Sequence, residues 1–445
     1  MASSGFFERF GGALATAAVL IGVIVNPSAP GRALEKAKSF SLPRTALADK
    51  PCRVAGPTLT SAFADIEDVV SVSPLGGVTA PYEPLPAPYI RINTRKGETA
   101  FDRRETAALA PARADVVAVE RRIRRNEEGI ATSQSWTVHL SICEDVSVYY
   151  DDLDAVSPEL MEKVGGLTAF EQIDGPDHTG VATRVRVATG DALGVGDGFD
   201  VGLEDRSVSP DDLVRPERYR TNPYAAARRR RVDPALIAAA STDPTRAQCP
   251  LDYLPKRVAA AWTGKLGDAY GLRKAKGDDA CRTALVEVAG AAQGAWYTDA
   301  AHNGATSKQS AIALAPDTID PKRMIFALHG RVPTLGPELV ALPPKQRAAR
   351  AAAAKDFLTF EAGGDGVSGA AQVNTPFKDV RVGETHCYQR LRANFVGPRI
   401  YGVVLLGLEE GPDGPVMRLE ARGDAQSCAD LEARAFSGRE TLFYR

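Results

Sequence analysis

Carboxylates in the first half of the chain are the side chains most able to do chemistry. They are Asp151, Asp152 and Asp154 after two tyrosines, and Asp197, Asp200, Glu204 and Asp205 on or beside a predicted strand. Two acids in one cleft can bind a hard cation or act as general acid and base. The alternative is that they are solvated turn and edge residues. His139 and His178 are the only histidines between residues 88 and 208, and His139 has the setting of a satisfied interior histidine.

An aromatic pair, Trp296 and Tyr297, is conspicuous in the second half. If the two rings are exposed, they can stack on sugar rings or grip a peptide; a position in the core is the alternative. The chain has no G-x-x-x-x-G-K-[ST] loop, and Gly194 to Gly198 lacks the spacing of a dinucleotide-binding loop. We therefore expect no cofactor.

Six cysteines indicate a disulfide framework rather than a metal site. None forms a C-x-x-C pair or lies at zinc-finger spacing from a histidine, so we expect no structural zinc. The order along the chain favours pairing within each section: Cys52 with Cys143, Cys249 with Cys281, and Cys387 with Cys428. Free buried thiols are the alternative. Disulfides persist in oxidising compartments, so the pattern predicts an exported protein.

An uncharged run near the N-terminus, Gly11–Val25, lies between Arg9 and Asn26–Pro27. It is short for a bilayer span, which needs about 20 residues, and fits the apolar core of a signal peptide. An uncleaved anchor and a buried core helix are the other interpretations. We expect a periplasmic or extracellular protein, either released or anchored by residues 11–25.

Composition limits the class of protein and its partners. The 445 residues are 44% hydrophobic and 25% charged, as in ordinary globular proteins of two or three domains. The 54 Lys and Arg residues nearly balance the 56 Asp and Glu residues, for a formal net charge of -2. No global field favours nucleic acid or an anionic membrane. We expect no nucleic-acid partner, and membrane contact only through the N-terminal segment.

Strands must position most of these residues. Short β-rich runs separated by Gly, Asp and Pro fill residues 88–208, and strand signals return beyond Cys281. Alanine-rich stretches predict helices within 224–262 and at 345–357. We therefore expect an α+β, mainly β fold. Its four sections are a signal peptide or anchor with tether (1–50), a β-rich domain (51–215), a helical segment (216–280) and a β-rich C-terminal domain with helical insertions (281–445).

Five short motifs follow one another in the first β-rich domain. They are Leu109 to Val117 (LAPARADVV), Thr137 to Leu140 (TVHL), Val148 to Leu153 (VYYDDL), Val187 to Gly194 (VATGDALG) and Phe199 to Glu204 (FDVGLE). This order resembles the lysostaphin-type zinc metallopeptidase barrel, in which a "YxHL" segment, a "GDxxG" turn and a final "HxHFE" strand occur in turn. The most telling element is the turn at Gly190 to Gly194. The resemblance implies a barrel scaffold for residues 88–208.

Carried over one at a time, the metal ligands of that family are missing. The histidine of "YxHL" falls on Asp152, and the two histidines of the final strand fall near Asp200 and Gly202. The first His and Asp would lie around Arg91 to Asp102, where no histidine occurs. A zinc hydrolase needs about three protein ligands and an open position. The resemblance therefore implies a degenerate metallopeptidase-like barrel without zinc, in which Asp152 and Asp200 face the former metal cleft.

These features predict an exported, noncatalytic protein of the cell envelope that binds a wall glycan, a peptide or an envelope protein. One alternative is an envelope hydrolase, peptidase-like, in which Asp152 and Asp200 have replaced the histidines. A second alternative is a structural scaffold protein. Fold alone does not decide among them, because function depends on the site.

Overall fold

The computed structural model describes residues 51–52, 58–77, 87–94, 105–126, 128–173, 175–209, 234–240, 242–277, 280–281, 287–298, 311–329, 357–362, 372–393, 400, 402–431 and 435–445. The apolar run 11–25, the tether and residues 345–356 of the predicted helix at 345–357 lie outside these ranges; Phe357, its last residue, begins a strand instead. Within the ranges, no helix has the length and apolar character needed to span a membrane.

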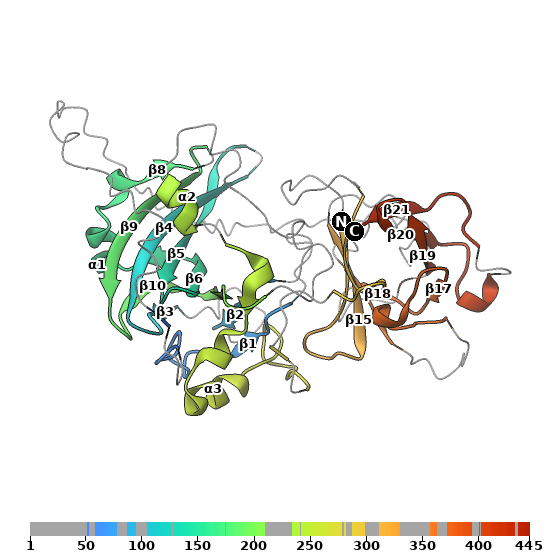
Figure 1. Ribbon diagram of the computed structural model, residues 1–445, viewed down its shortest axis with the longest axis horizontal. Helices are drawn as coiled ribbons and strands as arrows, with labels where there is room; N and C mark the ends of the chain where they lie inside the picture. The colour runs from blue at the N-terminus through green and yellow to red at the C-terminus, as the bar shows by residue number, and fades with distance from the viewer. Residues whose placement is uncertain are drawn as a thin grey trace, which may run out of the picture. The chain divides into compact units, whose positions relative to one another are not determined.

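The fold is mainly β with few helices, as the sequence predicts, and it includes a nearly closed eight-stranded barrel. The first sheet belongs to the N-terminal part of the described chain (Figure 1). Its strands pair in the order β1-β2-β11-β6-β5-β4-β9-β8, and β12 pairs with β11. In chain order they are β1 (Ser71–Ser73), β2 (Ile90–Asn93), β4 (Ala114–Arg125), β5 (Ala131–Ser141), β6 (Val146–Leu153), β8 (Glu171–Gln172), β9 (His178–Val187), β11 (Gly198–Asp205) and β12 (Ala247–Gln248).

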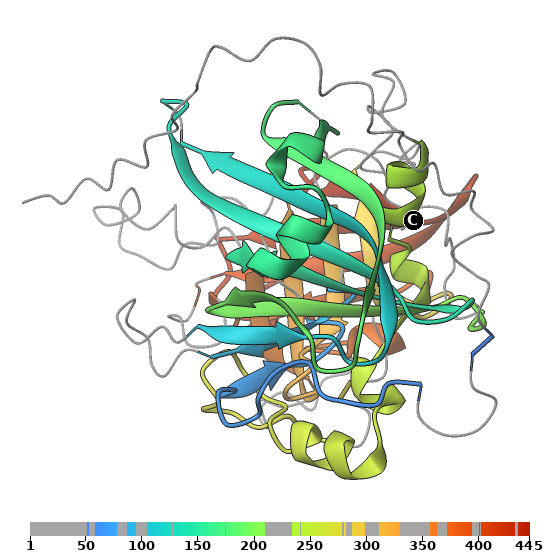
Figure 2. The same ribbon diagram turned by 90° about the vertical axis from the view of Figure 1, so that its left-hand side faces the viewer.

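Alternation along the strands gives the first sheet an apolar face and a polar face. On β11, Phe199, Val201 and Leu203 belong to the hydrophobic core, whereas Asp200 and Glu204 point to the opposite side. The neighbouring strands repeat this pattern. The strand β4 and its partner β5 run on beyond their neighbours as a long hairpin (Figure 2), whose outer residues are mostly exposed.

A smaller sheet and three short helices complete this part of the chain. The small sheet has the order β3-β10-β7 and contributes Ala108, Leu193 and Val156 to the core of the first sheet. Its strands are β3 (Thr106–Leu109), β7 (Ala155–Val156) and β10 (Ala192–Gly196), and the helices are α1 (Pro158–Lys163), α2 (Pro234–Ala240) and α3 (Lys256–Thr263). Helix α2 packs on β4 and β9, so it covers the polar face of the first sheet.

The second sheet contains nine antiparallel strands in the order β17-β19-β20-β21-β13-β14-β15-β16-β18. Its two edge strands, β17 and β18, follow each other closely in the chain. One face buries a ring cluster that includes Phe326, Phe360, Phe377 and Tyr388. The strands are β13 (Gly294–Tyr297), β14 (Ala311–Pro316), β15 (Arg323–His329), β16 (Phe357–Glu361), β17 (Thr385–Tyr388), β18 (Arg392–Ala393), β19 (Val403–Gly411), β20 (Gly414–Arg422) and β21 (Thr441–Tyr444).

Three disulfides join the six cysteines: Cys52–Cys143, Cys249–Cys281 and Cys387–Cys428. They are the three pairs expected from the chain order. Each closes a loop of 32 to 91 residues and restricts the unfolded chain accordingly. Three disulfides suit an oxidising environment of the kind that exported proteins meet.

Candidate functional site

Five polar side chains, one from each of five adjacent strands, form a row across the polar face of the first sheet. Arg91 on β2 lies opposite Asp200 on β11, and Asp200 lies opposite Asp151 on β6. Thr137 on β5 lies opposite Glu120 on β4, and its hydroxyl donates to the Asp151 carboxylate at 2.6 Å. We call these residues the polar row. The row brings the carboxylates singled out in the sequence next to partners that the sequence does not identify.

Arg91 brings the two predicted site residues together. Its Nη1 donates to Asp200 Oδ1 at 2.9 Å, and its Nη2 donates to Asp152 Oδ2 at 3.0 Å. Asp152 reaches the guanidinium because its backbone has a φ of 61°, which interrupts the strand alternation that would point it away from Asp151. Asp152 and Asp200 therefore converge, as expected, but they converge on a cation of the chain itself.

Three carboxylates lie at this end of the polar row, and the guanidinium of Arg91 binds two of them. Asp200 is only 5% exposed, and its pKa is raised to about 8, chiefly by burial and also by Asp151 and Asp152, against the attraction of Arg91. Burial also disfavours the charged guanidinium, but Asp200 and Asp152 outweigh this effect and raise the pKa of Arg91. At neutral pH, Asp200 therefore holds a proton and accepts one hydrogen bond from Arg91, while Asp152 accepts the other.

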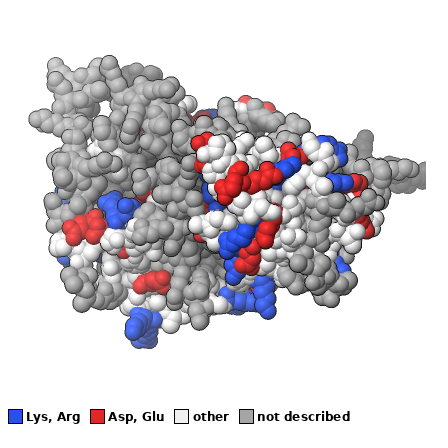
Figure 3. Space-filling model, turned by 45° about the vertical axis from the view of Figure 1, so that its right-hand side comes forward, with Lys and Arg blue, Asp and Glu red and all other residues white. Residues whose placement is uncertain are grey.

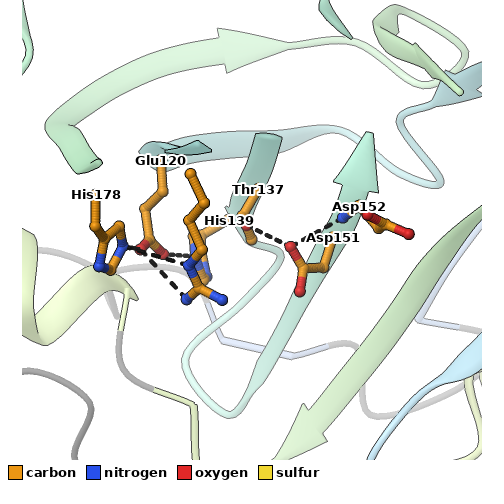
Figure 4. Close-up of polar contacts among 7 residues, drawn as sticks. Glu120, Thr137, His139, Asp151, Asp152 and His178 are labelled. Carbon is orange, nitrogen blue, oxygen red and sulfur yellow. Dashed lines mark hydrogen bonds and ion pairs between the residues drawn. The ribbon is translucent and has the colours of Figure 1, made fainter. Parts of the chain in front are cut away.

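Glu120 forms the other end of the polar row and lies between two histidines (Figure 4). Its Oε1 is 2.7 Å from His139 Nε2 on β5, and its Oε2 is 2.6 Å from His178 Nε2 on β9. An ionised carboxylate only accepts hydrogen bonds, so both Nε2 atoms are donors. Gly180 on β9 lies opposite Glu120. A larger residue would not fit at this position, because its Cβ would lie 2.8 Å from Ile173.

The charge of Glu120 is stabilised despite its burial. The side chain is 1% exposed, which alone would raise its pKa, but the hydrogen bonds from His139 and His178 hold the pKa well below its usual range. Arg122 adds a cation 3.8 Å from Oε2. Two histidines and a carboxylate are also ligands that metals use. Here their donor atoms are directed at one another, and no cluster among the described residues has the arrangement of a metal site.

A second buried acid lies on the same face of β11. Glu204 is 5% exposed, and burial raises its pKa to about 7, although the backbone N–H of Asp243 donates to its Oε1 at 2.6 Å. Beside it is a small cavity of about 30 Å³, which is lined in part by His139 and Tyr149. The cavity has room for water, but it is far smaller than the sites of about 300 to 1,000 Å³ that bind small molecules.

The aromatic pair proposed for ligand binding lies in the core. Trp296 is 0% exposed, donates its Nε1 hydrogen to the carbonyl of Ala292 at 2.7 Å, and has the guanidinium of Arg445 4.2 Å from its ring. Tyr297 is buried as well. Neither ring faces solvent, because both belong to the fully buried strand β13. The pair packs the protein rather than offering a stacking surface.

Sequence reasoning missed Arg91, Glu120 and His178 as partners in these clusters. Arg91 lies in the stretch where the peptidase resemblance would place its first metal-binding histidine. Glu120 begins the arginine-rich end of a strand, which the sequence suggests is exposed to solvent. A polar residue between two apolar residues of a strand, as in Ile90-Arg91-Ile92, was the sequence signal that could have indicated these partners.

On the face in Figure 3, acidic and basic side chains of the described residues are interspersed, which is consistent with the small net charge.

The sequence matches no protein-family model, and no curated protein or solved structure matches it. The resemblance to lysostaphin-type peptidases therefore stays a prediction from the motifs.

Proposed function

We propose that this chain is an exported, noncatalytic protein of the cell envelope that binds a wall glycan, a peptide or an envelope partner. The observation that carries the proposal is the position of Arg91 between Asp152 and Asp200. An acid pair that works on a substrate must reach it. Here both carboxylates are bound by a guanidinium of the chain itself, and the one that holds a proton at neutral pH is buried.

The three disulfides support the exported location, since such bonds persist in oxidising compartments. The polar row supports a structural role for the acids. Arg91 links β2, β11 and the end of β6, and Glu120 links β4, β5 and β9. These contacts hold the strands of the first sheet in one register and leave recognition to another surface.

The test is retention of the purified, disulfide-intact protein on an insoluble cell-wall fraction, together with assays for release of wall peptides and sugars. We expect retention without release. The matched variant Arg91→Met removes the guanidinium, and we expect it to lower stability without creating activity. Release of wall fragments by the wild-type protein, lost in Asp200→Asn, would contradict the noncatalytic proposal. Failure of the wild-type protein to bind any wall fraction would contradict the binding proposal.

An envelope hydrolase is the second candidate, and the raised pKa of Asp200 favours it. A carboxyl with a pKa of about 8 has the protonation state of a general acid at neutral pH. This function requires Arg91 to leave Asp200 when substrate enters. Its signature is hydrolysis that disappears in both Asp200→Asn and Asp152→Asn and declines as pH rises through about 8, as the pKa of Asp200 implies.

A further inference from the structure

A groove of about 500 Å³ opens on the outer face of the second sheet, away from the ring cluster. Its lining includes Gln372, Gly383, Glu384, Thr385, Arg418 and Phe436. Thr385 and Cys387 share this outer face of β17, whereas His386 and Tyr388 point to the other side. The volume is within the range of sites for small molecules, about 300 to 1,000 Å³.

The floor of the groove is built around Gly407 on β19, which lies between Thr385 on β17 and Arg418 on β20. A Cβ at Gly407 would lie 3.1 Å from Phe436 Cε2 and 3.4 Å from Thr385 Oγ1. A larger residue there would push the ring and the hydroxyl apart. Glycine therefore allows Phe436 to lie against the strand and form one wall.

Phe436 is held by a cation on one side. The guanidinium of Arg418 lies 4.4 Å from its ring centroid, and Arg418 is itself fixed by Glu409 and Glu440. Both neighbouring acids offset its charge, so the groove has no strong positive field. The half-buried ring is thus a fixed apolar surface among polar groups.

Polar atoms for recognition lie beside the ring. Glu384 uses Oε2 to accept from His386 Nε2 at 3.1 Å and from the N–H of Arg381 at 3.2 Å, and its side chain is 42% exposed. These hydrogen bonds lower the pKa of Glu384, so it is an ionised acceptor. Thr385 adds a hydroxyl that donates or accepts. A carboxylate and a hydroxyl next to an aromatic ring match the vicinal hydroxyls and the apolar C–H face of a sugar.

We propose that this groove binds a neutral saccharide, with its C–H face on Phe436 and its hydroxyls on Glu384 and Thr385. The inference rests on the proposed binding function and names its ligand class and site. An anionic ligand fits less well, because Arg418, the one cation in the described lining, is already paired with Glu409 and Glu440, and Glu384 adds a negative charge to the lining. A peptide is the other outcome that the test must separate.

The test is titration of the full chain with tri-N-acetylchitotriose, followed by calorimetry and by chemical-shift changes. We expect saturable binding, weakened about tenfold or more by Phe436→Ala and by Glu384→Gln, and less strongly by Thr385→Val. The matched control is Thr183→Val on β9, a half-buried strand threonine of the first sheet, which we expect to bind as the wild type does. Thermal unfolding of each variant shows whether it is folded.

The outcomes separate the groove from the broader function. Saturable binding of the trisaccharide that Phe436→Ala, Glu384→Gln and Thr385→Val leave unchanged would overturn the site. No binding of the trisaccharide by a wild-type protein that is retained on wall material would overturn the saccharide class and favour a peptide or protein partner. No retention of the wild-type protein on wall material would contradict the proposed function itself, whatever the groove does with the trisaccharide.

Discussion

Arg91 and Asp200 face each other across the antiparallel strands β2 and β11, with Nη1 of Arg91 2.9 Å from Oδ1 of Asp200. The same guanidinium holds Asp152 through Nη2. Removing either side chain leaves the other without this hydrogen bond, and a buried polar group that loses its partner costs about 1 to 3 kcal/mol. The contact therefore fixes the register of β2 and β11. It also makes the free energy of unfolding depend on whether Asp200 is protonated.

The stability of the protein should fall with rising pH because of Asp200. Burial raises its pKa to about 8 in the folded state, whereas an unfolded aspartate titrates near about 3.9. The folded state therefore binds this proton more tightly. The resulting stabilisation is complete below about pH 4 and is lost as pH rises to about 8. Asp200→Asn stays neutral throughout, so we expect a flatter dependence of the unfolding free energy between these limits, measured by denaturant titration.

Glu128→Gln is the control for this pH dependence, since Glu128 is an exposed residue of the β4–β5 hairpin. We expect its curve to parallel that of the wild type. A curve for Asp200→Asn with the same slope as the wild type would show that Asp200 is ionised in the folded protein at neutral pH.

Glu120→Gln should strongly destabilise the fold around the first sheet. The substitution removes the acceptor charge shared by His139 and His178 and turns an amide N–H₂ toward one of them. A buried donor left without its partner costs about 1 to 3 kcal/mol, and two donors are affected here. We expect a loss of about 2 to 5 kcal/mol at pH 7, measured by denaturant unfolding. A loss below about 0.5 kcal/mol, the usual range for surface substitutions, would mean that the cluster does not form.

The strands were predictable from the sequence because their signal is local. The Phe199–Leu203 run alternates apolar core residues with Asp200 and Gly202, and β11 contains all of it. Neighbouring cysteines along the chain likewise suggested the three pairs. Local patterns of this kind survive in the fold because each strand must bury one face.

The partners within the site were not predictable, because they depend on register between strands far apart in sequence. Arg91 and Asp200 are separated by 109 residues, and Glu120 and His178 by 58. Nothing near Arg91 in the chain indicates which carboxylate it meets. The burial of Trp296 could not be predicted either. The Gly294–Tyr297 run is short enough to be an edge strand or a core strand, and only its pairing with both β14 and β21 shows that it is a core strand.

Mass spectrometry of the unreduced protein should identify the three disulfide pairs. Proteolysis is expected to yield three linked peptide pairs, with no free thiol. Replacing both cysteines of Cys52–Cys143 by serine opens a loop of 91 residues, and replacing those of Cys249–Cys281 opens one of 32. On chain entropy alone, these changes cost about 4 to 5 kcal/mol, with the longer loop costing about 1 kcal/mol more. Detection of a free thiol or of a crossed pair would contradict the assignment.

Two fully buried tyrosines should respond oppositely to loss of their hydroxyls. Tyr150 donates to the carbonyl of Leu109 at 2.6 Å, whereas the hydroxyl of Tyr388 has no hydrogen-bond partner in the described part of the chain. Both rings are 0% exposed, so phenylalanine keeps the packing at each site. An unsatisfied buried polar group costs about 1 to 3 kcal/mol. We expect Tyr388→Phe to raise the unfolding free energy by about 1 kcal/mol and Tyr150→Phe to lower it by about 1 to 2 kcal/mol. A loss of stability in Tyr388→Phe would show that its hydroxyl has a partner, such as a buried water.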